Sequence, residues 1–188
     1  MRPDVALRDK DGTCGGTSRQ EAGDGVADLV AFLRARLDED EAAAMAATPG
    51  SWRYDPKKEW RNPERPFTDG QEAVFAGPPD GAAITICSTG PSNDPPSMAD
   101  ARHIARWDPA RVLAEVAAKQ QLIEAFSTAI TVRDGAIARV QTGSVMRADF
   151  DDIIRDWAIR VMTLEPLVVM AAQPYADHPN FDPAWKVS

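Results

Sequence analysis

Residues 108–126, DPARVLAEVAAKQQLIEAF, carry the strongest signal for the fold. Asp108 is a good helix N-cap, because its side chain can accept a hydrogen bond from the first turn. Pro109 suits the next position, where its missing N–H would have had no partner. Apolar side chains then recur at the spacing of one helix face, at Val112, Leu113, Val116, Leu122, Ile123 and Phe126. The stretch therefore predicts a long amphipathic helix.

The segments on either side are less regular. Upstream, a short helix is predicted over residues 98–107, with Ser97 as its N-cap and with Ile104 and Trp107 facing inward. Downstream, residues 127–144 leave two alternatives open, a β-hairpin or a continuation of the helix.

Two further amphipathic helices are predicted, one near each end of the chain. The first begins at Asp24 or Gly25, and Pro49 and Gly50 end it. Its apolar face consists of Val26, Leu29, Val30, Leu33 and Leu37. The last begins at Asp149, and Pro166 is expected to kink or divide it. Its apolar positions are Phe150, Ile153, Ile154, Trp157, Val161 and Leu164.

Residues 52–54, 73–75 and 82–87 are predicted to form short strands, the last two joined as a hairpin through residues 77–81. The polar residues 57–69 read as a surface loop. The fold class that follows is α+β and mainly helical. It has three amphipathic helices, the second preceded by a short helix at an Asp-Pro junction. A small antiparallel sheet or hairpin lies between the first and the second.

Length and composition indicate one domain. The chain has 188 residues, of which 44% are hydrophobic, enough for a real core. We expect residues 1–24 to be a disordered leader and residues 25–188 to form a single α+β domain. The net charge of −8 argues against non-specific binding to nucleic acid or to an anionic membrane. With no apolar run long enough for a bilayer and no signal-like start, we expect a cytoplasmic protein.

The sequence predicts no cofactor. Cys14 and Cys87 are too few for a disulfide framework, and two separate thiols are expected in a reducing compartment. The two cysteines and the two histidines, His103 and His178, are too scattered along the chain for a zinc site.

Three motifs resemble a family of small uncharacterised proteins. They are DLVAFLRARLDEDE at 28–41, HIARWDPARVL at 103–113, and PYADHP at 174–179 with Trp185 after it. The family is a domain of unknown function that occurs in Streptomyces and other actinobacteria and in some of their phages. The resemblance implies no activity, cofactor or catalytic residue, because none is established for the family.

One candidate metal site comes from the last predicted helix. Asp149, Asp152 and Asp156 are spaced i, i+3 and i+7, so their carboxylates share one helix face, and Mg²⁺ prefers oxygen ligands. The competing interpretation is a solvated surface, with Asp149 and Asp152 favoured near the positive end of the helix dipole. The acidic block at residues 38–41 is also interpreted as solvated surface.

His103 and His178, paired around Asp108 or Asp177, are the candidates for acid–base chemistry. Histidine titrates near neutral pH, and a carboxylate can fix its tautomer. The competing interpretation is structural, with His103 packing at the helix junction and His178 bonding backbone in a turn. No nucleophile motif and no phosphate-binding loop accompanies them.

The remaining candidates also have structural interpretations. Arg102, Arg106 and Arg111 could form an anion site at the Asp108 helix start, or pair with nearby carboxylates such as Glu115. The tail from Pro174 onward is rich in aromatic residues and is predicted to dock on the helical core. Its docking side chains would be Tyr175, Phe181 and Trp185, and Trp52, Trp107 and Trp157 are also interpreted as core or docking aromatics.

The function class that these observations favour is a non-enzymatic binding or regulatory protein. Its expected partner is another protein or a second copy, since helices with one apolar face can pair between chains. Two alternatives are kept open. One is a small metal-dependent hydrolase that uses the aspartates or the histidine pair, and the other is an acidic mimic of nucleic acid.

Overall fold

A computed structural model describes residues 17–57, 70–77 and 83–187, with side chains from Gly25 onward. Within this part the chain forms four α-helices, three strands and two 3-10 helices. In chain order these are α1 (Thr17–Ala46), β1 (Trp52–Tyr54), β2 (Gln71–Ala76), β3 (Ile84–Pro91), α2 (Pro95–Arg106), α3 (Pro109–Gln141), α4 (Arg147–Ala172), η2 (Gln173–Tyr175) and η3 (Pro183–Trp185). The expected mainly helical α+β fold is confirmed.

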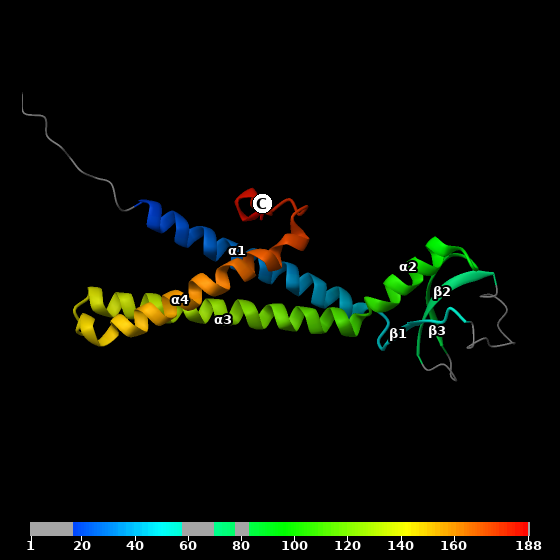
Figure 1. The fold of residues 1–188 in the computed structure, drawn as a ribbon, viewed down its shortest axis with the longest axis horizontal. Helices are drawn as coiled ribbons and strands as arrows, with labels where there is room; N and C mark the ends of the chain where they lie inside the picture. Colours follow the sequence, from blue (N-terminus) through cyan, green and yellow to red (C-terminus); the bar gives the residue numbers. More distant parts are fainter. Residues whose placement is uncertain (1–16, 58–69, 78–82, 188) are drawn as a thin grey trace, which may run out of the picture.

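The long helices α1, α3 and α4 pack side by side as an elongated bundle (Figure 1). Helix α3 runs antiparallel to both of its neighbours, and the tail after α4 turns back over α1. The apolar faces of the three helices meet in one core, whose buried members are Leu29, Val30, Leu33, Leu37, Val116, Ile123, Phe126, Ala129, Val161, Val168 and Ala172. This core is where most of the fold's hydrophobic stabilisation arises.

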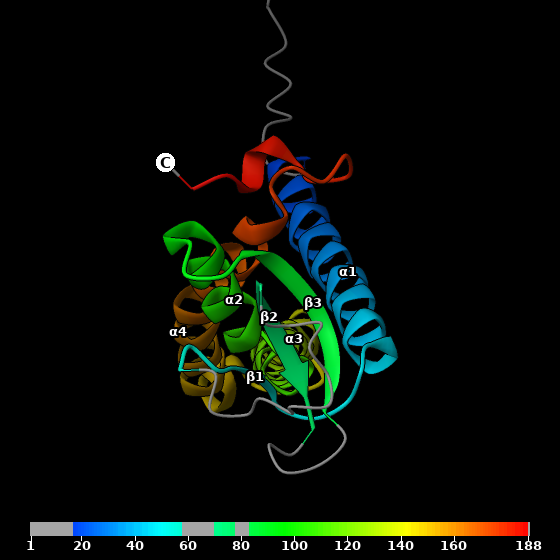
Figure 2. The same cartoon turned by 90° about the vertical axis from the view of Figure 1, so that its right-hand side faces the viewer.

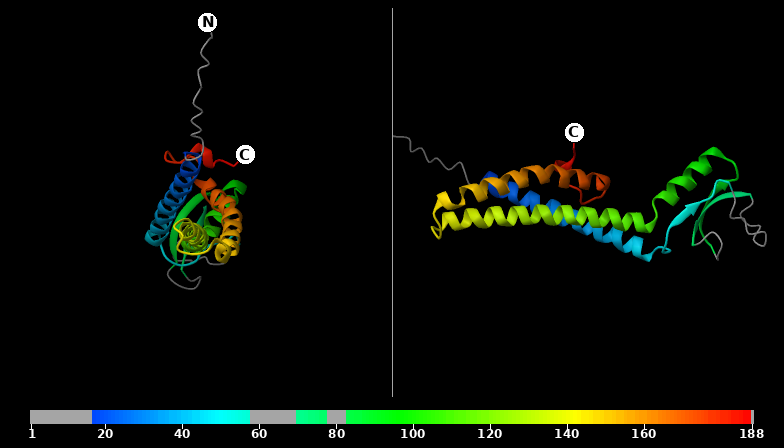
Figure 3. Two further views of the ribbon diagram at one scale, coloured as in Figure 1. Left: turned by 90° about the vertical axis from the view of Figure 1, so that its left-hand side faces the viewer. Right: turned by 60° about the horizontal axis from the view of Figure 1, so that its bottom comes forward.

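The sheet lies at the far end of the bundle, beyond the C-terminus of α1 (Figure 3). Its strand order is β1-β2-β3, and both pairs are antiparallel, with Trp52 opposite Ala76 and Val74 opposite Cys87. Helix α2 packs against all three strands and covers one face of the sheet (Figure 2). The predicted small antiparallel sheet is thus confirmed, with β2 and β3 reaching beyond the expected residues.

Helix α3 begins as the sequence predicts. Asp108 is the N-cap, its Oδ1 accepts a hydrogen bond from the N–H of Arg111 at 2.8 Å, and Pro109 occupies the first turn. Residues 127–141 continue this helix, so the hairpin alternative is not formed. Ala129 and Ala136 are buried there, which lets α4 pack closely against this part of α3.

The start of α2 corrects one prediction. The N-cap is Asp94, not Ser97, because Pro95 and Pro96 lack N–H groups and fit the first helical turn. The carboxylate of Asp94 accepts from the backbone N–H of Ser97 at 3.0 Å and from its hydroxyl at 2.6 Å. At the other end of α2, Trp107 is 41% exposed rather than inward, because the backbone leaves the helical conformation at this C-cap residue.

The two outer helices are longer than predicted. Helix α1 begins at Thr17, so residues 17–24 of the expected leader are helical in backbone, while residues 1–16 lie outside the described residues. Helix α4 begins at Arg147 and passes through Pro166 without dividing. The buried residues Val168 and Ala172 beyond the proline hold its last turns against the core.

Several expectations fall outside the described residues, including Cys14, most of the 57–69 loop and most of the hairpin connection at 77–81. Among the helices that are described, none is both long enough and apolar enough to cross a bilayer.

Candidate functional site

Exposed apolar side chains gather on α4. Ten large hydrophobic residues are exposed in the described part of the chain, and six of them lie on α4 or at its N-cap. These six are Met146, Ile153, Ile159, Met162, Leu167 and Met170. Ile159 is 55% exposed and Met162 is 72% exposed, although the opposite face of the same helix fills the core. Exposed apolar patches mark interaction sites, whereas single exposed apolar residues are ordinary, so the concentration of six on one helix makes α4 the candidate.

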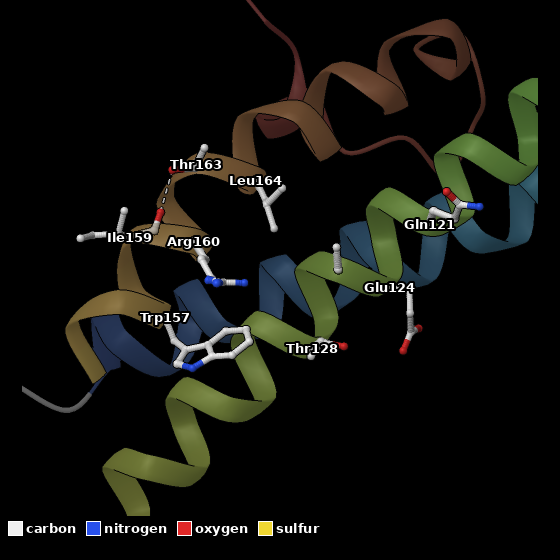
Figure 4. A pocket seen from close by; sticks show the side chains of 9 residues that line it. Gln121, Glu124, Thr128, Trp157, Ile159, Arg160, Thr163 and Leu164 are labelled. Carbon is white, nitrogen blue, oxygen red and sulfur yellow. Dashed lines mark hydrogen bonds between the residues drawn. The ribbon is translucent and has the colours of Figure 1, made fainter. Parts of the chain in front are cut away.

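Beside this surface, a groove of about 590 Å³ runs between α3 and α4, and we call it the α3–α4 groove. Its α3 wall consists of Gln121, Glu124, Ala125 and Thr128, and its α4 wall of Trp157, Ile159, Arg160, Thr163 and Leu164. Trp157, Arg160 and Leu164 point from α4 towards α3, whereas Ile159 and Thr163 point outward (Figure 4). The groove therefore continues onto the exposed apolar face of α4.

The chemistry of the α3–α4 groove is apolar with charged rims. The guanidinium of Arg160 lies over the ring of Trp157, 4.5 Å from its centroid, and so presents an aromatic–cation pair on the α4 wall. On the opposite wall, Glu124 forms an ion pair of 3.6 Å with Arg34 of α1. Both partners of that pair are largely exposed, so it contributes little to stability and leaves Glu124 accessible.

The aspartates of the predicted metal site lie on the same helix. Asp149, Asp152 and Asp156 are all exposed on the N-terminal half of α4, and Asp152 is paired with Arg155. In the described part of the chain, no three His, Cys, Asp or Glu side chains are grouped closely enough to hold a metal ion. Metal binding by the three aspartates stays a prediction.

The predicted histidine pair is distributed over two elements. His103 is exposed in the last turn of α2, with its ring 6.3 Å from that of Trp107. His178 lies in the tail, where Arg36 of α1 donates a hydrogen bond to its ring. The carboxylate of Asp108 is engaged as the α3 cap. Among the described contacts, these three residues share no partner. Acid–base chemistry through them stays a prediction.

Tail docking follows the sequence-based prediction. Tyr175, Phe181 and Trp185 pack against the core, and their rings surround Phe32 of α1 at centroid distances of 5.2–6.4 Å. The hydroxyl of Tyr175 donates to Asp40 at 2.5 Å. Burial and this hydrogen bond raise the pKa of Tyr175 well above its usual value.

The acidic block at 38–41 is therefore more than solvated surface, which corrects its interpretation. Besides Asp40, Glu39 pairs with Arg36, and Glu41 accepts from Gln120 of α3 at 3.1 Å. The side chain of Arg36 is only 11% exposed. These contacts link α1 to the tail and to α3, a connection between distant segments that local sequence patterns do not reveal.

Two of the three arginines near the α3 start are engaged with other side chains rather than with each other. Arg111 pairs with Glu115 at 3.0 Å and lies over Trp107, 4.3 Å from its ring centroid. Arg102 lies over Tyr54, 5.6 Å from its ring centroid. The alternative interpretation, in which such arginines pair with carboxylates, is thus confirmed for Arg111.

Sequence reasoning missed a buried carboxylate. Glu72 of β2 is 2% exposed and accepts hydrogen bonds from the Tyr54 hydroxyl at 2.7 Å and the Asn93 N–H at 2.8 Å. Burial, with the hydrogen bond and charge of Glu72, raises the pKa of Tyr54 to about 12. Asn93 has a positive φ of 62°, so this carboxylate holds the turn into α2. A glutamate inside a short apolar strand was the signal that could have revealed it.

Comparison with known proteins places the chain in a family without a known activity. Residues 26–187 match the family of unknown function DUF6221. No curated protein and no solved structure matches the chain. The match covers nearly the whole described region, from Val26, the first residue of the α1 apolar face, to the end of the docked tail. The chain therefore belongs to the DUF6221 family of unknown function.

Proposed function

We propose that this protein is a non-enzymatic protein-interaction module, and that α4 with the α3–α4 groove is its docking site. The observation that carries the proposal is the gathering of exposed apolar side chains on one helix of an otherwise well-packed bundle. Covering such side chains releases roughly 25 cal/mol for each Å² of apolar surface removed from water. A partner that covers Ile159, Met162 and Met170 would gain this free energy.

The groove supplies the specificity that a flat apolar patch lacks. Its lining includes Trp157 and Arg160, residue types that are enriched among the side chains that dominate binding energy. An amphipathic helix laid into an apolar groove is a recurring mode of peptide recognition. The long walls provided by α3 and α4 suit an occupant of that shape.

A site-specific crosslinking experiment tests this proposal. A photoreactive amino acid replaces Met162 on α4 or, as the matched control, Met45 on α1, which is also exposed. We propose an actinobacterial or phage origin and a cytoplasmic location for the protein. It is therefore made in the cytoplasm of an actinobacterial host. We expect a covalent protein adduct at position 162 and none at 45. The same adducts at both positions, or none at 162, would contradict the proposal.

A further inference from the structure

The outward face of α4 carries a second row of side chains at heptad spacing, which we call the outer row. Its seven members alternate at intervals of three and four residues, and all of them are exposed: Asp149, Asp152, Asp156, Ile159, Thr163, Pro166 and Met170. The alternation of three and four is the spacing that a second helix lying alongside requires. The inner row of α4, which includes Trp157, Val161, Leu164 and Val168, is already packed in the core.

The outer row has two chemically different halves. Its first three positions are aspartates, and its last four are two apolar residues with a threonine and a proline. Asp152 has a local partner in Arg155, but both side chains are largely exposed and the pair is weak. A helix that covers the whole row must therefore bury apolar groups at one end and meet negative charge at the other.

This charge pattern argues against a second copy as the occupant. In a parallel, in-register pair each aspartate would face its own copy, and like charges in contact are destabilising. In an antiparallel pair centred on Ile159, Asp149 would lie against Met170 and Asp152 against Pro166. Carboxylates would then lose water without gaining a partner, which costs free energy.

From these observations we propose that the outer row and the adjoining α3–α4 groove bind an amphipathic helix of another protein with one apolar half and one cationic half. Leucine-like side chains of the partner cover Ile159 and Met170, and Lys or Arg side chains lie opposite the three aspartates. Charge complementarity of this kind also fixes the direction in which the helix lies. This inference rests on the proposed function and assigns the chemistry of its partner.

Two synthetic helical peptides, each about three heptads long, test the inference. One carries Leu at the a and d positions of one half and Arg at those of the other half, and the second has Glu in place of each Arg. Binding of each labelled peptide to the full-length protein is measured by fluorescence anisotropy at about 50 mM and about 300 mM salt. We expect the cationic peptide to bind with an affinity that falls with salt and the anionic peptide to bind much more weakly.

Three variants locate the interaction. The D149N/D152N/D156N variant should weaken binding of the cationic peptide about tenfold, since each of the three exposed charge pairs contributes about twofold. It should also remove most of the salt dependence. D151N is the matched control, because Asp151 is exposed on α4, pairs with Arg147 and lies off the outer row; its binding should be unchanged. I159S/M170S should weaken binding through the apolar half. All of these positions are exposed, and circular dichroism checks that each variant folds.

The outcomes separate the inference from the function on which it rests. If both peptides bind equally and the I159S/M170S variant loses this binding, the docking site stands but the claim that the partner has a cationic half is overturned. If neither peptide binds, and light scattering shows a dimer that the I159S/M170S substitutions dissociate, the occupant is a second copy and the inference is overturned. No peptide binding by a monomeric protein would overturn both proposals.

Discussion

Phe32 of α1 is the residue against which the aromatic side chains of the C-terminal tail pack. The effect of replacing Phe32 on the free energy of unfolding should therefore depend on whether the tail residue Trp185 is present. Phe32 is buried, and the ring of Trp185 lies 5.2 Å from it between centroids. Phe32→Ala should lower the free energy of unfolding by about 3–5 kcal/mol, the range for buried Phe. Trp185→Ala, at a half-buried site, should cost about 1–3 kcal/mol.

The two substitutions should not be additive. Aromatic pairs contribute about 0.5–1.5 kcal/mol beyond the area they bury, so the double variant should be destabilised less than the sum by that amount. The measurement is urea unfolding followed by far-UV circular dichroism, with the free energy extrapolated to water. Val74→Ala is the control, because Val74 is fully buried in the sheet at the far end of the bundle (Figure 3) and should combine additively with Trp185→Ala. Additivity for Phe32 within about 0.3 kcal/mol would refute the docking account.

Three further predictions concern the sheet end and the tyrosines. Gly90→Ala should destabilise the fold, because φ at Gly90 is +144° and an added Cβ would lie 2.3 Å from the Ser97 hydroxyl oxygen. Gly135 lies in α3 with open space around it, so Gly135→Ala should stabilise the fold by about 0.5–1 kcal/mol in thermal melts. Glu72→Ala should cost about 1–3 kcal/mol in urea unfolding by leaving buried donors without an acceptor, and an unchanged midpoint would contradict this role. Absorbance at 295 nm should show no tyrosine ionising near pH 10 in the folded protein, since the pKa of Tyr54 is raised to about 12 and that of Tyr175 is raised further. In the folded protein both tyrosines have a higher pKa than in the unfolded chain, so their contribution to the free energy of unfolding is complete below about pH 10. That contribution is lost as the pH rises through the folded pKa values. The urea midpoint should therefore fall as the pH rises above about 10.

Local signals predicted the elements whose causes are local. Asp108 and Pro109 fix the start of α3 through one cap and one proline, and both are visible in the sequence. The start of α2 was misjudged because two residues competed for the cap. Ser97 resembles a capping residue, but the two prolines before it favour Asp94. Residues 127–141 were ambiguous because only packing of Ala129 and Ala136 decides in favour of helix.

The candidate site was predictable in part. The spacing of Asp149, Asp152 and Asp156 on one helix face was read from the sequence, and the structure shows the three side chains exposed on one helix. The sequence does not predict that Ile159 and Met170 lie in line with these aspartates on the solvent side. An apolar residue at helical spacing is normally interpreted as part of the core. Which apolar face of α4 is buried depends on contacts with α1 and α3. The bond between Tyr175 and Asp40 likewise joins residues too far apart for any local pattern.

The central claim is that α4 presents a docking site for a helix. The most direct test is an NMR titration of the protein, labelled at its methionine methyl groups, with the peptide that carries Leu and Arg halves. The methyl signal of Met170, a member of the outer row, should shift as peptide is added, and that of Met45, which is also exposed on α1, should stay in place. An unmoved Met170 signal, or an equal shift of Met45, would contradict the claim.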